Sequence, residues 1–448
     1  MSATRWHAPY AWLPGGPARD VVFEIEDGRF TAVHPDGTGG SPGGAAAGAA
    51  RRLPGIVLPG LANAHSHAFH RALRGRTHDR GGDFWSWRER MYGVARRLDP
   101  DGYLALARAT YAEMALAGIT CVGEFHYLHH GPDGTPYDDR NAMGEALRQA
   151  AAEAGIRLTL LDTLYLAGGL TPEGHSPPDG PQRRYGDGDV ESWAGRVAGL
   201  KPSAGMRVGV AAHSVRAVPR EALAGVRDTA AGRPLHVHLS EQPAENAACE
   251  GYYGLTPTGL LDAEGLLGPM TTAVHATHLT EADIAALGRS RTTACLCPTT
   301  ERDLADGIGP ARELRDAGAA LSLGSDQHAV IDLLEEARAL EMHERLRTLR
   351  RGRFTPGDLL GAATAHDGLG WPDAGRLEPG ARADLVAVRL DTPRTAGIAP
   401  GQVVFAATAA DVDTVIVDGR VVVAAGRHVL GDVAALLKAA VEPLWENG

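Results

Sequence analysis

The chain has 448 residues, of which 44% are hydrophobic and 22% charged, so it can bury a large core and is too apolar to be disordered. Its formal net charge of −11 argues against general binding to nucleic acid or to a membrane surface, but not against a small acidic substrate held by local arginines. Four cysteines provide no disulfide framework, residues 1–16 lack the pattern of a secretory signal, and no apolar run approaches the ~20 residues that span a bilayer, so we expect a cytoplasmic protein.

Both ends of the chain have short apolar runs, bounded by turns, that predict β-strands. These runs are residues 10–13, 21–25, 30–33, 383–388 and 415–423. The last of them is predicted to be a hairpin with Asp418-Gly419 at its turn, and a Gly/Ala-rich loop is predicted for residues 37–50. We therefore expect a small β-sandwich domain built from both chain ends, residues 1–58 and 374–448.

The middle of the chain, residues 59–373, alternates short apolar runs with longer stretches of helical spacing. The apolar runs are residues 56–64, 119–125, 158–165, 208–213, 235–239, 273–275, 293–297 and 321–325. The helical stretches include residues 103–117, 140–154 and 281–288. Eight strand–helix units in roughly 270 residues predict an α/β protein with a (β/α)₈ TIM-type barrel. A doubly wound open sheet is the alternative, but no G-x-G-x-x-G motif follows the first strand to support a dinucleotide-binding fold.

Polar and ionisable residues stand at the carboxyl end of nearly every predicted barrel strand. His65 and His67 follow the first strand two positions apart, and on an extended backbone their side chains point to the same face. The later strand ends carry Glu124, His126, His213, Arg216, His236, His238, Glu241, His275, His278, Asp326 and His328. Active sites of such barrels lie at this end, and neutral imidazole is a common zinc ligand, so we expect a metal-dependent active site there.

Over nearly its whole length, this chain resembles the amidohydrolase superfamily. The matching residues are His65-x-His67, His238-x-x-Glu241, His275 and Asp326. Residues 375–385 and 417–420 also resemble the C-terminal β domain of that superfamily. The resemblance implies a (β/α)₈ barrel that carries one or two metal ions and is flanked by a small β domain.

The end of the fourth strand indicates the branch of the superfamily. Binuclear members bridge their metals there with a carboxylated lysine or a glutamate, whereas this chain has His213, and Lys201 lies well upstream. The site therefore resembles the mononuclear deaminase branch, which implies one Zn²⁺, or another divalent ion such as Fe²⁺. The implied ligands are His65, His67, His238 and Asp326. His213 is then free to contact the substrate, and a role as an extra ligand is the alternative.

Three residues of this set imply acid–base chemistry. A zinc ion lowers the pKa of bound water towards ~7, and Glu241 is suited to carry the proton from water to a leaving nitrogen. Asp326 can bind zinc and also hold a proton, and His275 can hydrogen-bond the developing charge. We expect these three to be the catalytic residues.

Three loop segments give a narrower resemblance, to the N-formimino-L-glutamate deiminases of histidine degradation. They are residues 84–92, 123–130 and 213–216. This resemblance implies an enzyme that hydrolyses N-formimino-L-glutamate to N-formyl-L-glutamate and ammonia. The resemblance to the wider superfamily implies a homodimer. That substrate has two carboxylates, which guanidinium groups bind bidentately, and Arg88 and Arg216 lie within these segments. The other implied substrate contacts are Tyr127, His213 and His70, the last at a position where the family often has glutamine.

Two other functions remain open. A related mononuclear deaminase acting on guanine or a similar heterocycle would favour aromatic stacking on its flat substrate, but aromatic residues are only 5% of the chain. A non-catalytic binding protein of the same fold is expected to lose metal ligands, whereas all four implied ligands are present. His126, His129 and His130 form a further cluster, which either holds a second metal or lies on loops in contact with water.

Overall fold

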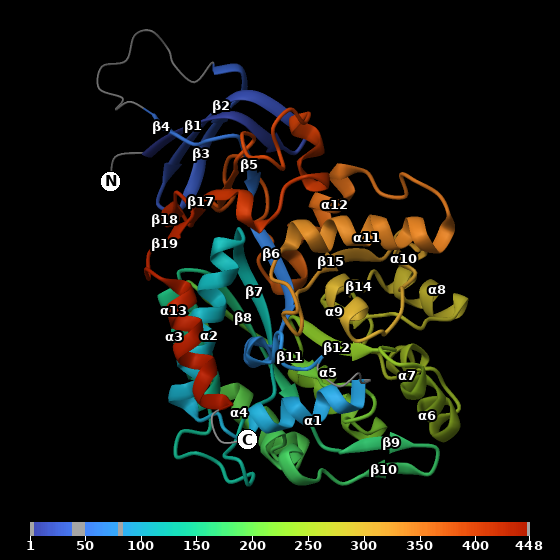
Figure 1. Ribbon diagram of the computed structural model, residues 1–448. Helices are drawn as coiled ribbons and strands as arrows, with labels where there is room; N and C mark the ends of the chain where they lie inside the picture. The colour runs from blue at the N-terminus through green and yellow to red at the C-terminus, as the bar shows by residue number, and fades with distance from the viewer. Residues whose placement is uncertain (1–3, 38–49, 79–83, 446–448) are drawn as a thin grey trace.

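The computed structural model describes residues 4–37, 50–78 and 84–445, with a barrel of parallel strands at its centre (Figure 1). Neighbouring strands of this eight-stranded sheet follow the chain order. The strands are β6 (Leu61–Ser66), β7 (Ile119–His126), β8 (Arg157–Leu164), β11 (Met206–Ala212), β12 (Leu235–Leu239), β13 (Thr271–His275), β14 (Thr293–Leu296) and β15 (Ala320–Leu323). Helices separate consecutive strands along the chain, and the predicted (β/α)₈ barrel is confirmed.

The predicted helices are present as α2 (Pro100–Leu116), α3 (Ala142–Ala154) and α8 (Glu281–Ser290). Asp99 caps α2 by accepting a hydrogen bond from the Gly102 backbone N–H at 2.7 Å, which satisfies a donor that has no partner within the helix. The remaining α-helices are α1 (Phe84–Ala95), α4 (Val190–Gly199), α5 (Arg220–Thr229), α6 (Pro243–Tyr253), α7 (Pro257–Ala263), α9 (Pro298–Asp303), α10 (Ala311–Ala317), α11 (Leu333–Thr348), α12 (Pro356–Ala363) and α13 (Val433–Val441). Among the described residues, no helix is both long and apolar enough to cross a membrane.

The two chain ends form a second sheet of nine strands, which lies above the barrel in the view of Figure 1. Its strands are β1 (Thr4–Leu13), β2 (Gly16–Glu26), β3 (Arg29–His34), β4 (Arg51–Arg52), β5 (Ile56–Pro59), β16 (Leu385–Val388), β17 (Val412–Val417), β18 (Arg420–Ala424) and β19 (Arg427–His428). Side chains from both chain ends, among them Phe23 and Ile416, share one apolar cluster. The Asp418-Gly419 turn joins β17 to β18 with positive φ at both residues, as a tight two-residue hairpin requires. The expected β structure from both chain ends is thus present as one nine-stranded sheet, whereas most of the predicted loop 37–50 lies outside the described residues.

The predicted strand 56–64 proved to be two strands with different partners. β5 pairs antiparallel with β16 in the end sheet, and β6 pairs with β7 in the barrel. Gly60 separates them at a point where a Cβ atom would lie 2.3 Å from the hydroxyl oxygen of Thr120, so the junction requires glycine. The two strands look continuous in the sequence because both are buried along their whole length.

The barrel closes between its last strand, β15, and its first strand, β6. The backbone N–H of Ser325 donates to Oδ1 of Asn63 at 2.9 Å, and Nδ2 of Asn63 donates to Oγ of Ser325 at 2.7 Å. One step further along, the Asp326 N–H donates to the His65 carbonyl at 3.0 Å, and the His67 N–H donates to the Asp326 carbonyl at 3.2 Å. The closure therefore places three predicted metal ligands side by side.

A buried ion pair joins the barrel to the β domain. Arg157, at the start of β8, donates two hydrogen bonds to Asp384, and its Nη1 also lies 3.2 Å from Oδ1 of Asp418. The backbone N–H of Asp418 donates to Oδ1 of Asp384 at 3.0 Å. Both side chains of the Arg157–Asp384 pair are only 1% exposed, so water cannot replace a missing partner.

Replacing Asp384 with asparagine should destabilise the fold strongly, because it leaves the charge of Arg157 buried without its main partner. Breaking such a pair typically costs about 3–5 kcal/mol, and the midpoint of thermal unfolding should fall clearly. Arg389→Gln removes an exposed pair with Asp391 and serves as the matched control, with an unchanged midpoint expected. Equal midpoints for Asp384→Asn and the unaltered protein would contradict this role of the pair.

Candidate active site

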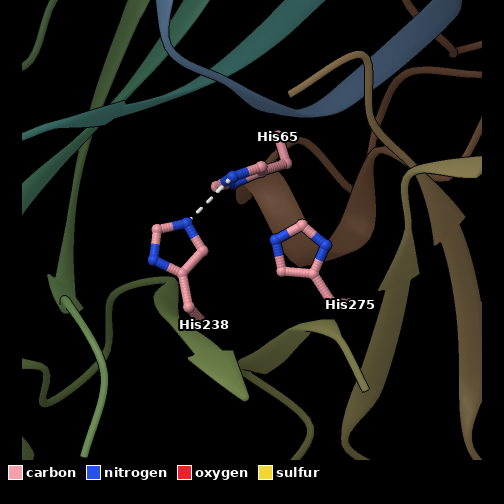
Figure 2. Close-up of side chains that lie close together, drawn as sticks. All are labelled: His65, His238 and His275. Carbon is pink, nitrogen blue, oxygen red and sulfur yellow. Dashed lines mark hydrogen bonds between the residues drawn. The ribbon is translucent and has the colours of Figure 1, made fainter. Parts of the chain in front are cut away.

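Four predicted ligands converge at the carboxyl end of the barrel. Nε2 of His238 lies 3.2 Å from Nε2 of His65 and 3.3 Å from Nε2 of His67. Oδ1 of Asp326 lies 3.3 Å from Nε2 of His65 and 3.4 Å from Nε2 of His67. Figure 2 shows His65 and His238 pointing toward one another, with His275 beside them.

Four of the six separations within this set are thus known, and each suits a shared metal ion. Ligand atoms about 2.0–2.1 Å from a zinc ion in tetrahedral geometry lie about 3.3–3.4 Å from one another, which matches these four distances. Nδ1 of His67 donates to the Phe125 carbonyl and Nδ1 of His238 donates to the His213 carbonyl, both at 2.9 Å, so Nε2 of each ring faces the centre. The residues present therefore suit a divalent ion.

The protonation of the three histidine ligands supports the same conclusion. Burial lowers the pKa of His67 to about 3, and burial together with the neighbouring histidines lowers the pKa values of His65 and His238 well below the usual range. All three imidazoles are therefore neutral at physiological pH and have a lone pair available for a metal.

The backbone at three of the strand ends is strained. Ser240, His275 and Asp326 have φ angles of 51°, 68° and 42°, which place non-glycine residues in the left-handed region. Each such residue costs of order 1–3 kcal/mol and persists where the surrounding structure holds it. The strain turns the chain at the ends of β12, β13 and β15, where the predicted site residues lie.

His275 lies between two carboxylates of the site. Its Nε2 is 3.9 Å from Oε1 of Glu241 and 3.9 Å from Oδ2 of Asp326, while its Nδ1 is 3.8 Å from Oε1 of Glu301. Burial alone lowers the pKa of His275, but the negative charges of Glu241, Asp326 and Glu301 raise it to about 10. The three predicted catalytic residues are thus brought together at one point.

Arg216 is bound to one of these predicted catalytic residues. Its Nη2 donates to Oε2 of Glu241 at 2.8 Å, and its Nε lies 3.5 Å from Oε2 of the buried Glu245. The other carboxylate oxygen of Glu241, Oε1, is thereby left facing His275. Arg216 was predicted only as a substrate contact, and in the structure it also orients Glu241.

A cavity opens in front of the predicted ligands, and His67, His238 and Asp326 form part of its lining. All five predicted substrate contacts line it: His70, Arg88, Tyr127, His213 and Arg216. Nε2 of His70 lies 2.9 Å from the Tyr127 hydroxyl, and Nδ1 of His213 lies 3.2 Å from the Ser214 hydroxyl. Among the described residues, the groups of ligand atoms close enough to share an ion do not include His213.

Six further cavity residues were missed by the sequence analysis. They are Trp87, Met91, Tyr92, Tyr165, Tyr185 and Leu304. Trp87, Met91 and Tyr92 lie in the segment 84–92 that had already been singled out, and Tyr165 ends a predicted strand, so a signal existed for these. Tyr185 ends a short 3₁₀ helix and Leu304 follows the short helix α9, and neither segment has a periodic pattern in its sequence.

In the second histidine cluster, the acidic residue Asp162 is already paired with Arg196. His126, His129 and Asp162 lie close enough to share an ion. Both oxygens of Asp162, however, accept hydrogen bonds from Arg196, at 2.6 and 2.9 Å, and Nε2 of His130 lies 3.2 Å from the Asp187 carboxylate. A guanidinium already supplies the positive charge there, and His129 and His130 are buried rather than on water-exposed loops.

The other strand-end histidines lie outside the cavity lining and bond the fold itself. His236 lies 3.2 Å from the carbonyl of Gly368, and His278 lies 2.8 Å from the carbonyl of Asp306. His328 contacts the hydroxyl of Ser325 at 2.9 Å. The sequence analysis placed these histidines at polar strand ends, and in the structure they bond to groups around the site.

Comparison with known proteins agrees with this geometry. The amidohydrolase family model matches residues 56–422, and the chain belongs to that family. Together with the relatives that follow, the match identifies a hydrolase acting on carbon–nitrogen bonds. Formimidoylglutamate deiminase of Pseudomonas aeruginosa is 39% identical, covering 94% of this chain and 95% of that protein. 8-oxoguanine deaminase of the same species is 32% identical, covering 92% of each. The crystal structure of an amidohydrolase from Brucella melitensis has 32% identity and a TM-score of 0.89, covering 98% of this chain and 99% of that chain.

We predict one divalent ion per chain, which elemental analysis of the purified protein will measure. His238→Ala should lose the ion, because it removes one of four converging ligand atoms. His126→Asn alters the second cluster, where Arg196 already supplies positive charge, and should retain the ion. Two ions in the unaltered protein, or full retention by His238→Ala, would contradict the four-ligand site.

Proposed function

We propose that the chain hydrolyses N-formimino-L-glutamate to N-formyl-L-glutamate and ammonia, with one zinc ion held by His65, His67, His238 and Asp326. The observation that carries this proposal is the pairing of that ligand set with two arginines, Arg88 and Arg216, in one cavity. The 39% identity with a formimidoylglutamate deiminase supports it. We further propose that the chain acts in histidine degradation, where this substrate arises.

The residues around the ligands suit a hydrolytic deamination. A zinc ion held by these residues would lower the pKa of a bound water molecule towards about 7. Glu241 accepts one proton as the water oxygen attacks the formimino carbon and passes it to the imino nitrogen. As the carbon–nitrogen bond breaks, the hydroxyl of the adduct gives its remaining proton, by way of Asp326, to the same nitrogen, which leaves as ammonia. His275 lies within 3.9 Å of both Glu241 and Asp326, where its Nε2–H can donate to the oxygen that becomes the formyl oxygen.

The two arginines give the cavity its preference for an acidic substrate. A guanidinium binds a carboxylate through two parallel N–H groups, and such charge-assisted hydrogen bonds are about twice as strong as neutral ones. We assign one substrate carboxylate to Arg88 and the other to Arg216, with Tyr127, His70 and His213 as the remaining polar contacts. Because Arg216 also holds Glu241, binding of the substrate there is linked to the position of the proton carrier.

A purine deaminase is the second candidate, and one observation favours it. Aromatic residues are rare in the chain, yet five of them line the cavity: Trp87, Tyr92, Tyr127, Tyr165 and Tyr185. The similarity to an 8-oxoguanine deaminase agrees with a flat substrate. The argument from overall composition against a heterocycle therefore does not hold locally. The buried Arg216 has no obvious partner on a neutral purine, which is why we prefer the dicarboxylate.

Glu241→Gln should keep the metal and lose most of the activity. General acid–base groups are typically worth about 10²- to 10⁴-fold, and the amide cannot accept the proton of water. Ammonia release measured alongside metal content tests this. Glu264 is a half-buried carboxylate that pairs with Arg220 outside the cavity lining, and the control Glu264→Gln should behave like the unaltered protein. Near-normal turnover by Glu241→Gln with full metal content would remove Glu241 from its proposed role.

A substrate panel with two arginine variants tests the substrate itself. The unaltered protein should release ammonia from N-formimino-L-glutamate far faster than from its diamide, 8-oxoguanine or guanine. Arg88→Met should lose about 10- to 150-fold in kcat/KM for the diacid, the usual range for one hydrogen bond to a charged group, and be nearly indifferent for the diamide. Arg216→Met should slow both substrates, because it also releases Glu241.

Arg90→Met is the matched control for this series, since Arg90 lies on α1 beside Arg88 but does not line the cavity. It should process the diacid normally. A preference of the unaltered protein for 8-oxoguanine, or normal processing of the diacid by Arg88→Met, would defeat the assignment.

A further inference from the structure

Gln182 lies outside the cavity, behind two tyrosines that line it. It belongs to a short 3₁₀ helix, Gly180–Tyr185, and is only 6% exposed. Its Nε2 lies 2.9 Å from the Tyr165 hydroxyl oxygen and 3.2 Å from that of Tyr92. One residue that does not line the cavity therefore contacts both phenols.

The backbone determines which end of the Gln182 amide faces the phenols. Its Oε1 accepts a hydrogen bond from the Asp179 N–H at 3.0 Å, and a backbone N–H is only a donor. Its Nε2 donates to the Gly168 carbonyl at 2.9 Å, and a carbonyl is only an acceptor. Exchanging the nitrogen and the oxygen would break both bonds, so the nitrogen points at the phenols.

This orientation decides where the phenol hydrogens go. An amide nitrogen donates hydrogen bonds and accepts none, so neither tyrosine can give its hydroxyl hydrogen to Gln182. Among the described residues, no acceptor faces the hydroxyl of Tyr92 or of Tyr165. Both residues line the cavity, and their O–H groups are available to a bound molecule there.

The surroundings of these hydroxyls favour an anion. The guanidinium carbon of Arg88 lies 5.4 Å from the centre of the Tyr92 ring, and His213 packs edge-on against Tyr165 at 4.8 Å. Burial raises the pKa of both phenols, while the positive charges of Arg88 and Arg216 act in the opposite direction. This end of the cavity thus combines two hydroxyl donors with the guanidinium groups of Arg88 and of Arg216, the latter also bound to Glu241, and this arrangement suits a carboxylate.

We propose that Tyr92 and Tyr165 bind a carboxylate of the substrate, and that Gln182 is the positioning residue that directs their hydroxyl hydrogens into the cavity. This inference rests on the proposed function for the identity of the substrate, but its chemistry applies to any dicarboxylate of similar length. It adds two substrate contacts and one supporting residue to the set that the motifs imply.

Titration calorimetry of the zinc-loaded protein with glutarate tests the two contacts without relying on turnover. Tyr92→Phe and Tyr165→Phe should each weaken glutarate binding about 10-fold, the lower end of the range for a hydrogen bond to a charged group. Neither should change the much weaker binding of glutaramide. Tyr185→Phe is the matched control, because this cavity phenol is directed at Sδ of Met91, and it should lose clearly less than the other two.

Two substitutions of Gln182 separate positioning from a merely structural role. Gln182→Glu has nearly the same shape but offers the phenols an acceptor, so their hydrogens should turn away from the substrate and glutarate binding should fall at least 10-fold. Gln182→Met offers no acceptor and should cost less, because the hydrogens stay available to the ligand. In a protein that also carries Tyr92→Phe and Tyr165→Phe, Gln182→Glu should add little further loss.

The outcomes distinguish this inference from the proposed function. If the phenylalanine variants bind glutarate as tightly as the unaltered protein, or if Gln182→Met is as damaging as Gln182→Glu, the inference is wrong even when N-formimino-L-glutamate is a substrate. If glutarate binding depends on the hydroxyls as described but no ammonia is released from that substrate, the inference stands and the proposed function fails. An unaltered protein that binds glutarate no better than glutaramide would overturn the inference directly.

Discussion

The closure of the barrel is the constraint on which the rest of the site depends. Two backbone hydrogen bonds, from Asp326 to His65 and from His67 to Asp326, join the last strand to the first. Without them, ligands separated by some 260 positions in the chain would have no common position. The same closure puts Asn63 and Ser325 in mutual hydrogen bonds one step deeper in the barrel, where the cost of an unpaired polar group enforces their geometry.

Burial then strongly influences the protonation state of each ionisable group in the site. Burial keeps the histidine ligands neutral, so that they present lone pairs, and raises the pKa of Glu124 to about 8. Glu124 accepts hydrogen bonds from the Ser66 hydroxyl and the Ala68 N–H, both at 2.6 Å, which fixes the chain on either side of His67. His275 is the exception, because the negative charges of Glu241 and Glu301 raise its pKa and keep it protonated. Acid, base and ligand roles thus follow from neighbours as much as from residue type.

Much of this could be predicted from the sequence. The eight barrel strands were located because each is a short apolar run. His65 and His67 were paired because side chains two residues apart on a strand share a face, whereas His238 and Asp326 were implied by the superfamily resemblance. The structure places these four side chains together. The junction at Gly60 was missed, since two fully buried strands leave no polar residue to mark the boundary.

Other features depend on side-chain directions that no periodic pattern encodes. The hydrogen bond from Arg216 to Glu241 joins two loops. Gln182 contacts Tyr92 and Tyr165 from a segment whose sequence has no periodic pattern. The five aromatic residues that line the cavity were not predicted, because the aromatic content is an average over the whole chain. Local chemistry of this kind becomes visible only when the loops are placed around the barrel.

The identity of the products tests the central claim most directly. Nuclear magnetic resonance of N-formimino-L-glutamate labelled with ¹³C at the formimino carbon will follow that carbon during incubation with the zinc-loaded protein. Attack at this carbon with loss of its terminal nitrogen predicts N-formyl-L-glutamate and ammonium in equal amounts. Appearance of the label in formamide, with release of glutamate, or no consumption of the substrate at all, would contradict the account.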